Sequence, residues 1–265
     1  MNRIKIAALL IVLASCVATD NKIIDIETLK VGMSTGIVQG YISDSAADVV
    51  AWDDIPFAQP PVGDLRWRAT RPLTAANQII RSKDDTACVQ KASDYGGVSG
   101  EGILGSEDCL YLDVKAPADF KDKSYPVMFW IHGGGNTTGL KDFYDYSRLV
   151  ALKDVVVVST NYRLGGLGWF SHPAIQNHQE GEDKSTNFGT LDIIESLKWV
   201  QTNISKFGGN PDNVTIFGES AGGHNVYALL ASPMSDGLFH KAISQSGYTT
   251  SHSLEDAHNR DGGNP

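Results

Sequence analysis

The sequence lacks any cluster of lysine and arginine residues. Its 22 basic residues are outnumbered by 31 acidic residues, which gives a formal net charge of −9 at pH 7. A protein that binds nucleic acid usually carries a basic face that pairs with phosphates, so the charge balance argues against such a partner. Hydrophobic residues make up 42% of the chain and charged residues 20%, which is typical of a globular protein.

The N-terminus has no apolar run long enough to span a bilayer. Arg3 and Lys5 precede an apolar run over residues 6–14, and a short run behind a positive segment is typical of an export signal. The run ends in Leu13-Ala14-Ser15-Cys16, which resembles the lipobox of bacterial lipoproteins. This resemblance implies lipidation of Cys16 and a membrane anchor in the cell envelope, in the periplasm or at the outer membrane. The alternative is secretion after ordinary cleavage behind Ala18.

Cysteine is scarce, with three residues in the whole chain. When Cys16 is assigned to the signal, Cys88 and Cys109 remain, an even number in a protein expected to enter an oxidising compartment. The segment between them is polar and rich in glycine, so a crosslink would restrict the unfolded chain and stabilise the fold by about 3 kcal/mol. We therefore expect a disulfide between Cys88 and Cys109. The alternative is two free, buried thiols.

Buried strands alternate with helices in the second half of the chain. Residues 127–131 and 155–158 are continuous apolar runs, which indicate strands covered on both faces. Residues 187–204 show apolar positions at helical spacing before a Gly-Gly-Asn-Pro breaker. This alternation predicts an α/β fold with a mostly parallel sheet and helices on both faces. The other elements expected are a hairpin over 36–42 and 48–54, strands over 110–115, 214–217 and 241–245, and helices over 146–152 and 221–231.

The expected domain organisation follows from these elements. We expect a signal peptide over residues 1–18, a tether over residues 19–30 and a single folded domain over residues 31–265. No internal repeat is visible in the sequence.

A Gly-x-Ser-x-Gly motif joins the strand at 214–217 to the following helix. Such a strand-to-helix turn holds a serine on a strained elbow with its hydroxyl clear of the sheet. Gly218 and Gly222 would give the room that a Cβ atom would fill. Ser220 is therefore the candidate nucleophile. The alternative is an ordinary turn of small residues.

Four stretches of the chain resemble the type-B carboxylesterase family, whose members have the α/β-hydrolase fold. The resemblance extends over about residues 32–248, and one signature differs, because Asp113 stands where the family usually has asparagine. The four stretches are 107–114 (EDCLYLDV), 130–135 (WIHGGG), 207–214 (FGGNPDNV) and 217–223 (FGESAGG).

The resemblance implies hydrolysis of a small-molecule carboxylic ester through an acyl-enzyme, with no metal or cofactor. The backbone amides of Gly134, Gly135 and Ala221 would form the oxyanion hole that stabilises the tetrahedral intermediate. The alternative is that the three glycines form only a flexible turn. The family usually has an aromatic residue after these glycines, and here Asn136 predicts a more polar wall beside the site.

The family also implies roles for several charged residues and for the cysteine pair. Cys88 and Cys109 match its first disulfide. Glu219 matches a residue that tunes the site electrostatically, although a solvated acid favoured by the helix dipole is the alternative. Cholinesterase activity is not expected, because Tyr95 is the only aromatic residue between the two cysteines and an ammonium group needs an aromatic cage. The expected structural ion pairs are Arg66–Glu107 and Arg163–Asp192, each with solvated surface charges as the alternative.

The sequence has no obvious partner for Ser220. In α/β-hydrolases the acid and then the histidine follow the serine, and the family places both further on than residue 265. His224 lies on the helix that follows the elbow and does not easily reach the hydroxyl. Asp256 and His258 follow Ser220 in the order acid, then histidine, but this agreement is only formal. We therefore expect an N-terminal portion of an esterase that is much less active alone than an intact triad. A non-catalytic binding or adhesion module and an inactive remnant of a split gene are the alternatives.

Overall fold

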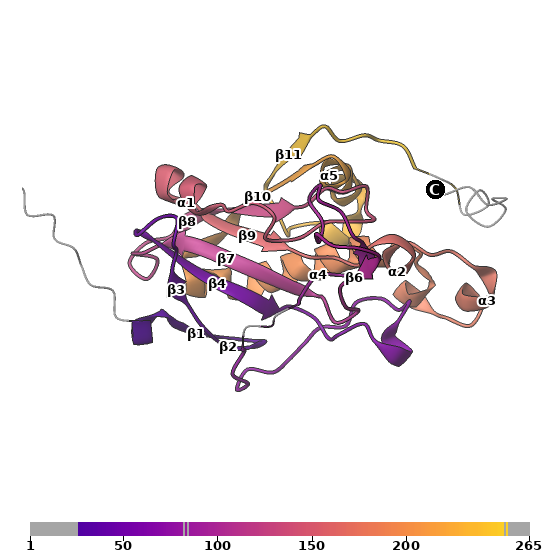
Figure 1. The fold of residues 1–265 in the computed structure, drawn as a ribbon, viewed down its shortest axis with the longest axis horizontal. Helices are drawn as coiled ribbons and strands as arrows, with labels where there is room; N and C mark the ends of the chain where they lie inside the picture. The colour runs from indigo at the N-terminus through magenta and orange to yellow at the C-terminus, as the bar shows by residue number, and fades with distance from the viewer. Residues whose placement is uncertain (1–25, 82, 84, 252, 254–265) are drawn as a thin grey trace, which may run out of the picture.

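The computed structural model describes residues 26–81, 83, 85–251 and 253, and its main feature is a seven-stranded sheet (Figure 1). The strands lie in the spatial order β11 (Lys241–Gln245), β10 (Gly209–Glu219), β8 (Tyr125–Ile131), β9 (Val156–Thr160), β7 (Tyr111–Pro117), β4 (Val49–Pro56) and β3 (Tyr41–Ile42). Two further pairs of strands lie outside it, β1 (Lys30–Met33) with β2 (Gly36–Gln39), and β5 (Gln90–Lys91) with β6 (Ile103–Leu104).

The sheet is mixed. Its half from β9 through β8 and β10 to β11 is parallel, as the sequence predicts, and it leads to the elbow. The other half, in which β7 pairs with β9 and β4 and then β4 with β3, is antiparallel. The apolar pattern could not show this difference, because β4 is as deeply buried as the parallel strands. A continuous apolar run indicates burial on both faces, whichever way the neighbouring strands run.

Helices cover both faces of the sheet. Alternate side chains of a strand point to opposite faces, so Val156 and Val158 of β9 join the large core while Val157 packs on the other side. The large core lies between the sheet and the helices α4 (Phe188–Asn203) and α5 (Ala221–Ala231). The smaller cluster lies under α1 (Ser147–Lys153) and includes Val150. The three helices and the strands β8 to β11 therefore follow the sequence expectation closely.

The folded part of the chain begins before residue 31. Ile26–Leu29 forms a 3-10 helix, and Leu29 is buried in the large core. The Leu29 carbonyl accepts hydrogen bonds from Trp52 Nε1 at 2.7 Å and from the Gly40 amide at 3.1 Å. The expected tether over 19–30 is therefore wrong for its last residues, and residues 19–25 lie outside the described part.

The expected hairpin is only partly correct. Strand β3 pairs with β4, but β2 pairs with β1, a strand that the sequence did not suggest. Gly40 separates β2 from β3, and a Cβ atom there would lie 2.4 Å from the Trp52 ring. The break between the two strands thus lies where the backbone passes directly against this tryptophan.

The remaining helices are short. None of the helices in the described residues is long and apolar enough to cross a membrane. The short helices are α2 (Gly165–Gly168), α3 (Pro173–Gln176) and the 3-10 helices Gly63–Leu65, Gly181–Lys184, Ile204–Phe207 and Pro233–Ser235.

Candidate active site

Ser220 lies on a strained turn between β10 and α5. Its backbone dihedrals are φ 55° and ψ −119°, a combination that costs a non-glycine residue about 1–3 kcal/mol and that persists where its surroundings enforce it. The Ser220 amide donates to the Gln245 carbonyl of β11 at 2.8 Å. A Cβ atom on Gly222 would lie 2.1 Å from the Ile131 carbonyl oxygen. The close approach expected at the motif glycines is therefore present, and Ser220 is partly exposed.

The glycine loop, residues 132–139, packs directly against this elbow. A Cβ atom on Gly133 would lie 3.3 Å from the Ser220 Cβ and 2.7 Å from the Glu219 carbonyl oxygen. Gly134 and Gly135 have φ values of 96° and 64°, which glycine adopts without steric cost. The structure thus brings Gly133 against the candidate nucleophile, and Gly134 and Gly135 follow it directly in the loop.

Three backbone amides of the glycine loop and the elbow have no hydrogen-bond acceptor among the described residues, namely those of Gly134, Gly135 and Ala221. Within the part of the chain that the structure describes, no acceptor is bonded to the amides of Gly134 and Gly135. Ala221 is the first residue of α5, and an amide at that position has no intrahelical partner. Open donors next to a nucleophile can stabilise a developing oxyanion.

Hydrogen bonds within the glycine loop and from the neighbouring Gln90 hold the loop in place. The amides of Thr137 and Thr138 donate to the Gly134 carbonyl at 3.1 and 3.0 Å. The buried side chain of Gln90 bonds both backbone groups of Gly139, donating to its carbonyl and accepting from its amide, each at 2.9 Å. Gln90 belongs to the loop between the two cysteines, so this loop supports the glycine loop. No pattern in the sequence indicated this contact.

A buried charge cluster ties the end of the glycine loop to the sheet. The Lys141 ammonium lies 2.8 Å from Asp113 of β7 and 3.1 Å from Asp54 of β4, and all three side chains are buried. Burial raises the pKa of Asp113 to about 7, although Lys141 opposes that shift. Burial opposes the charge on Lys141, but the neighbouring carboxylates, Asp113 first, raise its pKa. Asp113 is the residue that departs from the family signature.

His132 is buried and neutral. Its Nδ1 donates to the Gly133 carbonyl at 2.8 Å, and its ring stacks on Tyr162 with centroids 4.3 Å apart. Its Nε2 has no hydrogen-bond partner among the described residues. Burial lowers the pKa of the imidazole to about 4, while the bond to Gly133 opposes the shift. His132 therefore shapes the glycine loop.

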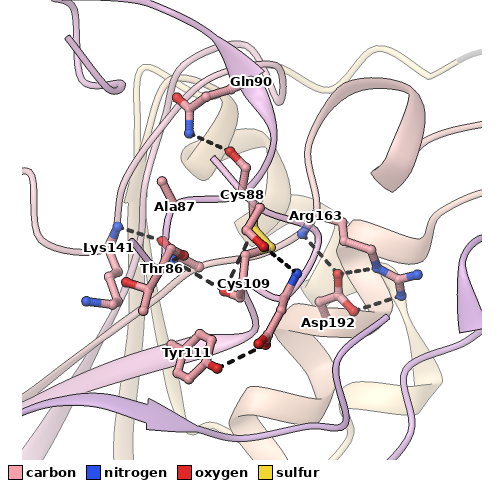
Figure 2. Close-up of a disulfide and its surroundings, with 12 residues drawn as sticks. Thr86, Ala87, Cys88, Gln90, Cys109, Tyr111, Lys141, Arg163 and Asp192 are labelled. Carbon is pink, nitrogen blue, oxygen red and sulfur yellow. Dashed lines mark hydrogen bonds and ion pairs between the residues drawn. A yellow bond between two sulfur atoms is a disulfide. The ribbon is translucent and has the colours of Figure 1, made fainter. Parts of the chain in front are cut away.

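The expected disulfide is present (Figure 2). Cys88 and Cys109 are joined with their Cα atoms 4.9 Å apart, and both are buried. Free thiols are thereby excluded. Figure 2 also shows Gln90 above the disulfide and the Arg163–Asp192 pair to its right.

Both expected ion pairs form, in different surroundings. Arg163 and Asp192 are almost fully buried, and the Arg163 Nε lies 2.8 Å from the carboxylate. Arg66 and Glu107 make two contacts of 2.5 Å near the surface. The alternative of solvated surface charges is therefore wrong for the first pair, which joins the end of β9 to α4.

The structure provides no evident base for Ser220. Among the described residues, no side chain is hydrogen-bonded to its hydroxyl, and the two histidines that follow it in the described chain have other partners, with His240 at the far end of β10 and β11. His224 Nδ1 lies 2.6 Å from the Tyr248 carbonyl, and His240 Nδ1 accepts from the Val214 amide at 3.1 Å. Asp256 and His258 lie outside the described residues.

A cleft of about 360 Å³ opens beside the elbow. Exposed Glu219 lines it, and its aromatic walls come from three separate segments of the chain. Asn136 does not line this cleft, so the more polar wall expected from that residue is not found there. In the described part of the chain, no group of histidine, cysteine and acidic residues could hold a metal ion. The lining consists of Asp94, Tyr95, Gly96, Trp130, His132, Gly133, Gly134, Phe143, Tyr144 and Glu219.

The sequence is similar to several known ester hydrolases. Residues 27–263 match the sequence profile of the Carboxylesterase family. The chain is 45% identical to Pyrethroid hydrolase Ces2e of Rattus norvegicus over 224 residues, 80% of this chain and 38% of that protein. It is also 45% identical to Para-nitrobenzyl esterase of Bacillus subtilis (strain 168) over 209 residues, 78% of this chain and 42% of that protein.

The structure is similar to the same group of proteins. A solved structure of a thermophilic pNB esterase matches with a TM-score of 0.75 and 40% identity, over 86% of this chain and 46% of its own. The chain spans about 40% of the length of the two curated relatives, and the shared architecture is the α/β-hydrolase fold. Because the profile extends over most of the chain and the structural match agrees with it, the chain belongs to the Carboxylesterase family.

Proposed function

We propose that the chain carries the nucleophile and the oxyanion hole of a serine carboxylesterase. The observation that carries the proposal is the contact between the elbow and the glycine loop. Ser220 is held in a strained conformation against Gly133, and the next two residues of the loop, Gly134 and Gly135, have amides without an acceptor among the described residues. An arrangement of this kind stabilises the charge that develops when an ester carbonyl is attacked.

The reaction follows from this geometry in two steps. In the first step, the Ser220 oxygen attacks the ester carbonyl carbon and gives its proton to a base, and the carbonyl oxygen becomes an oxyanion. The amides of Gly134, Gly135 and Ala221 donate to that oxyanion, and its collapse expels the alcohol, which takes up the proton. In the second step, water attacks the acyl-serine in the same way and releases the acid. The chain spans about 40% of the length of two relatives, and we propose that the base belongs to the part of the family's domain that this chain does not include.

The cleft beside the elbow favours esters with an apolar or aromatic group. Trp130, Phe143 and Tyr144 form its apolar walls, while Asp94 and Glu219 add two carboxylates. An anionic ester would meet these like charges, which disfavour its binding. The relatives named for hydrolysis of pyrethroids and of para-nitrobenzyl esters support small neutral esters as the substrate class.

Hydrolysis of para-nitrophenyl acetate tests the proposal. We expect the folded chain to show a rate that Ser220→Ala abolishes, and we expect added imidazole to raise that serine-dependent rate, because imidazole can act as a base near neutral pH. A wild-type rate equal to that of Ser220→Ala, with and without imidazole, would contradict the proposal. That result would favour a non-catalytic module or an inactive remnant.

We also propose that the protein is exported and anchored through a lipid on Cys16. The sequence Leu13-Ala14-Ser15-Cys16 supports the anchor, and the disulfide between Cys88 and Cys109 supports an oxidising compartment. We expect Cys16→Ser to move the protein from the membrane fraction to the soluble fraction when it is expressed in a bacterial host. An unchanged distribution would exclude lipidation at this residue.

A further inference from the structure

Asn136 connects the glycine loop to the helix that follows the nucleophile. Its side-chain carbonyl accepts a hydrogen bond from Asn225 Nδ2 of α5 at 3.0 Å. The Tyr162 hydroxyl lies 3.3 Å from the same oxygen and 2.7 Å from the His132 carbonyl, to which it donates. Asn225 and Tyr162 are both buried. The side chain of Asn136, a partly buried residue, is thus turned toward α5.

The backbone of Asn136 is also fixed. Its φ of 56° is left-handed, a conformation that asparagine tolerates better than most residues. Its carbonyl accepts from the Gly165 amide at 2.7 Å. Asn136 directly follows Gly135, so the orientation of the Gly135 peptide depends on how Asn136 is held.

Asn225 belongs to the same rigid unit as Ser220. The two residues lie on one elbow and one helix, and the His224 amide donates to the Ser220 carbonyl at 2.9 Å in the first turn of α5. The bond from Asn225 to Asn136 therefore links the segment that carries the nucleophile to the segment that carries the glycine amides. A phenylalanine side chain at position 136 would have no oxygen to accept this bond.

We propose that Asn136 and Asn225 are positioning residues that hold the oxyanion donors of the glycine loop in register with Ser220. The role rests on the proposed function, since it matters for catalysis only if Ser220 attacks an ester. Small displacements of preorganised donors lower the rate of the chemical step and change substrate binding much less. Loss of the bond should therefore lower kcat with little effect on KM.

Hydrogen–deuterium exchange tests the tether without any need for activity. The amides of Thr137, Thr138 and Gly139 are bonded within or behind the loop and report its order. We expect Asn136→Gly, which keeps the left-handed backbone accessible, and Asn225→Ala each to speed their exchange about fivefold, the effect of one ordinary hydrogen bond. The double variant should exchange no faster than the single ones. Asn136→Asp, which keeps an acceptor oxygen, should remain close to wild type.

Two matched variants control for a general loss of stability of the fold. Asn203→Ala removes a buried amide from α4 that bonds Ser34, and it should lower stability without changing exchange of the glycine loop. Asn177→Gly introduces a glycine at the exposed end of α3, and it should change neither the exchange nor the hydrolysis.

Kinetics of the serine-dependent hydrolysis of para-nitrophenyl acetate complete the test. We expect Asn136→Gly and Asn225→Ala to lower kcat about tenfold with KM changed less than about twofold, and we expect the two effects to be non-additive. Three results would each overturn the proposal. The effects of the two substitutions could be additive, the variants could exchange at the wild-type rate, or the variants could keep the kcat of an active wild-type protein. If exchange shows the coupling but the wild type hydrolyses no ester, the proposed function fails and the bond is only structural, which also overturns the assigned role.

Discussion

At the scale of single residues, the site depends on backbone conformations that most side chains avoid. Ser220 and Asn136 have positive φ, as do Gly134 and Gly135. These four residues lie on the two segments that meet at the nucleophile. The close packing of β8, β10 and α5 around these residues offsets the local strain. A Cβ atom on the turn glycines would collide with the neighbouring backbone.

We expect Gly134→Ala to abolish most of the serine-dependent hydrolysis. An alanine Cβ would lie 2.2 Å from the Thr138 carbonyl oxygen, on a residue with φ of 96°, so the loop must move and carry its amides away from Ser220. Loss of one oxyanion donor typically lowers kcat about 100- to 1,000-fold. Gly166→Ala is the control, because nothing lies within 4 Å of its added Cβ. Equal activity of the two variants would contradict the role of the loop.

We expect His132 to make the fold less stable in acid. Burial lowers the pKa of its imidazole to about 4 from an ordinary 6.5, so between these pH values the folded state binds fewer protons here than the unfolded chain. The contribution of His132 to the free energy of unfolding is fully present above pH 6.5. It is lost as the pH decreases toward 4, by about 3 kcal/mol at most. Urea unfolding across this range should show a smaller loss in His132→Asn than in wild type. Identical pH profiles would contradict a buried neutral histidine.

At the scale of elements, apolar pattern and turn chemistry predict most of the framework. The runs at 127–131 and 155–158 became β8 and β9, and the motif around Ser220 became the expected turn between β10 and α5. The sequence does not predict strand direction in β4 and β7, since burial on both faces looks the same in either direction. It also missed β1, because a short strand after an export signal resembles a polar tether.

The buried supports of the site were missed for a different reason. Gln90 and Lys141 look like solvated residues in sequence, and Asn225 like an ordinary helix residue. Their roles depend on contacts with distant segments, namely the glycine loop and the strands β4 and β7. Local spacing carries no signal for such contacts. Only the departures at Asp113 and Asn136 marked places where this chain differs from the family pattern.

We expect Lys141→Met to destabilise the protein by about 3–5 kcal/mol, because it leaves the carboxylates of Asp113 and Asp54 buried without a cation. Asp113→Asn should cost less, since Lys141 keeps Asp54 at 3.1 Å. Free energies of unfolding from urea titrations measure both changes. A loss in Lys141→Met no larger than that in Asp113→Asn would contradict the view of Lys141 as the balancing charge of this cluster.

At the scale of the whole molecule, three separate parts of the chain converge on the elbow. The disulfide loop supports the glycine loop through Gln90, the charge cluster fixes the end of that loop to the sheet, and α5, which directly follows Ser220, carries Asn225. Strand β11 completes the arrangement through the bond from the Ser220 amide to Gln245. The candidate site is therefore a product of the tertiary fold, and it is organised around one serine.

Covalent labelling with a fluorophosphonate tests this central claim most directly. We expect the folded chain, with imidazole present as a base, to gain one phosphonyl group, and peptide mass spectrometry to place it on Ser220. Ser220→Ala should take up no label, and Gly134→Ala should react much more slowly than Gly166→Ala. An unlabelled wild-type protein, or a label on another serine, would contradict the account.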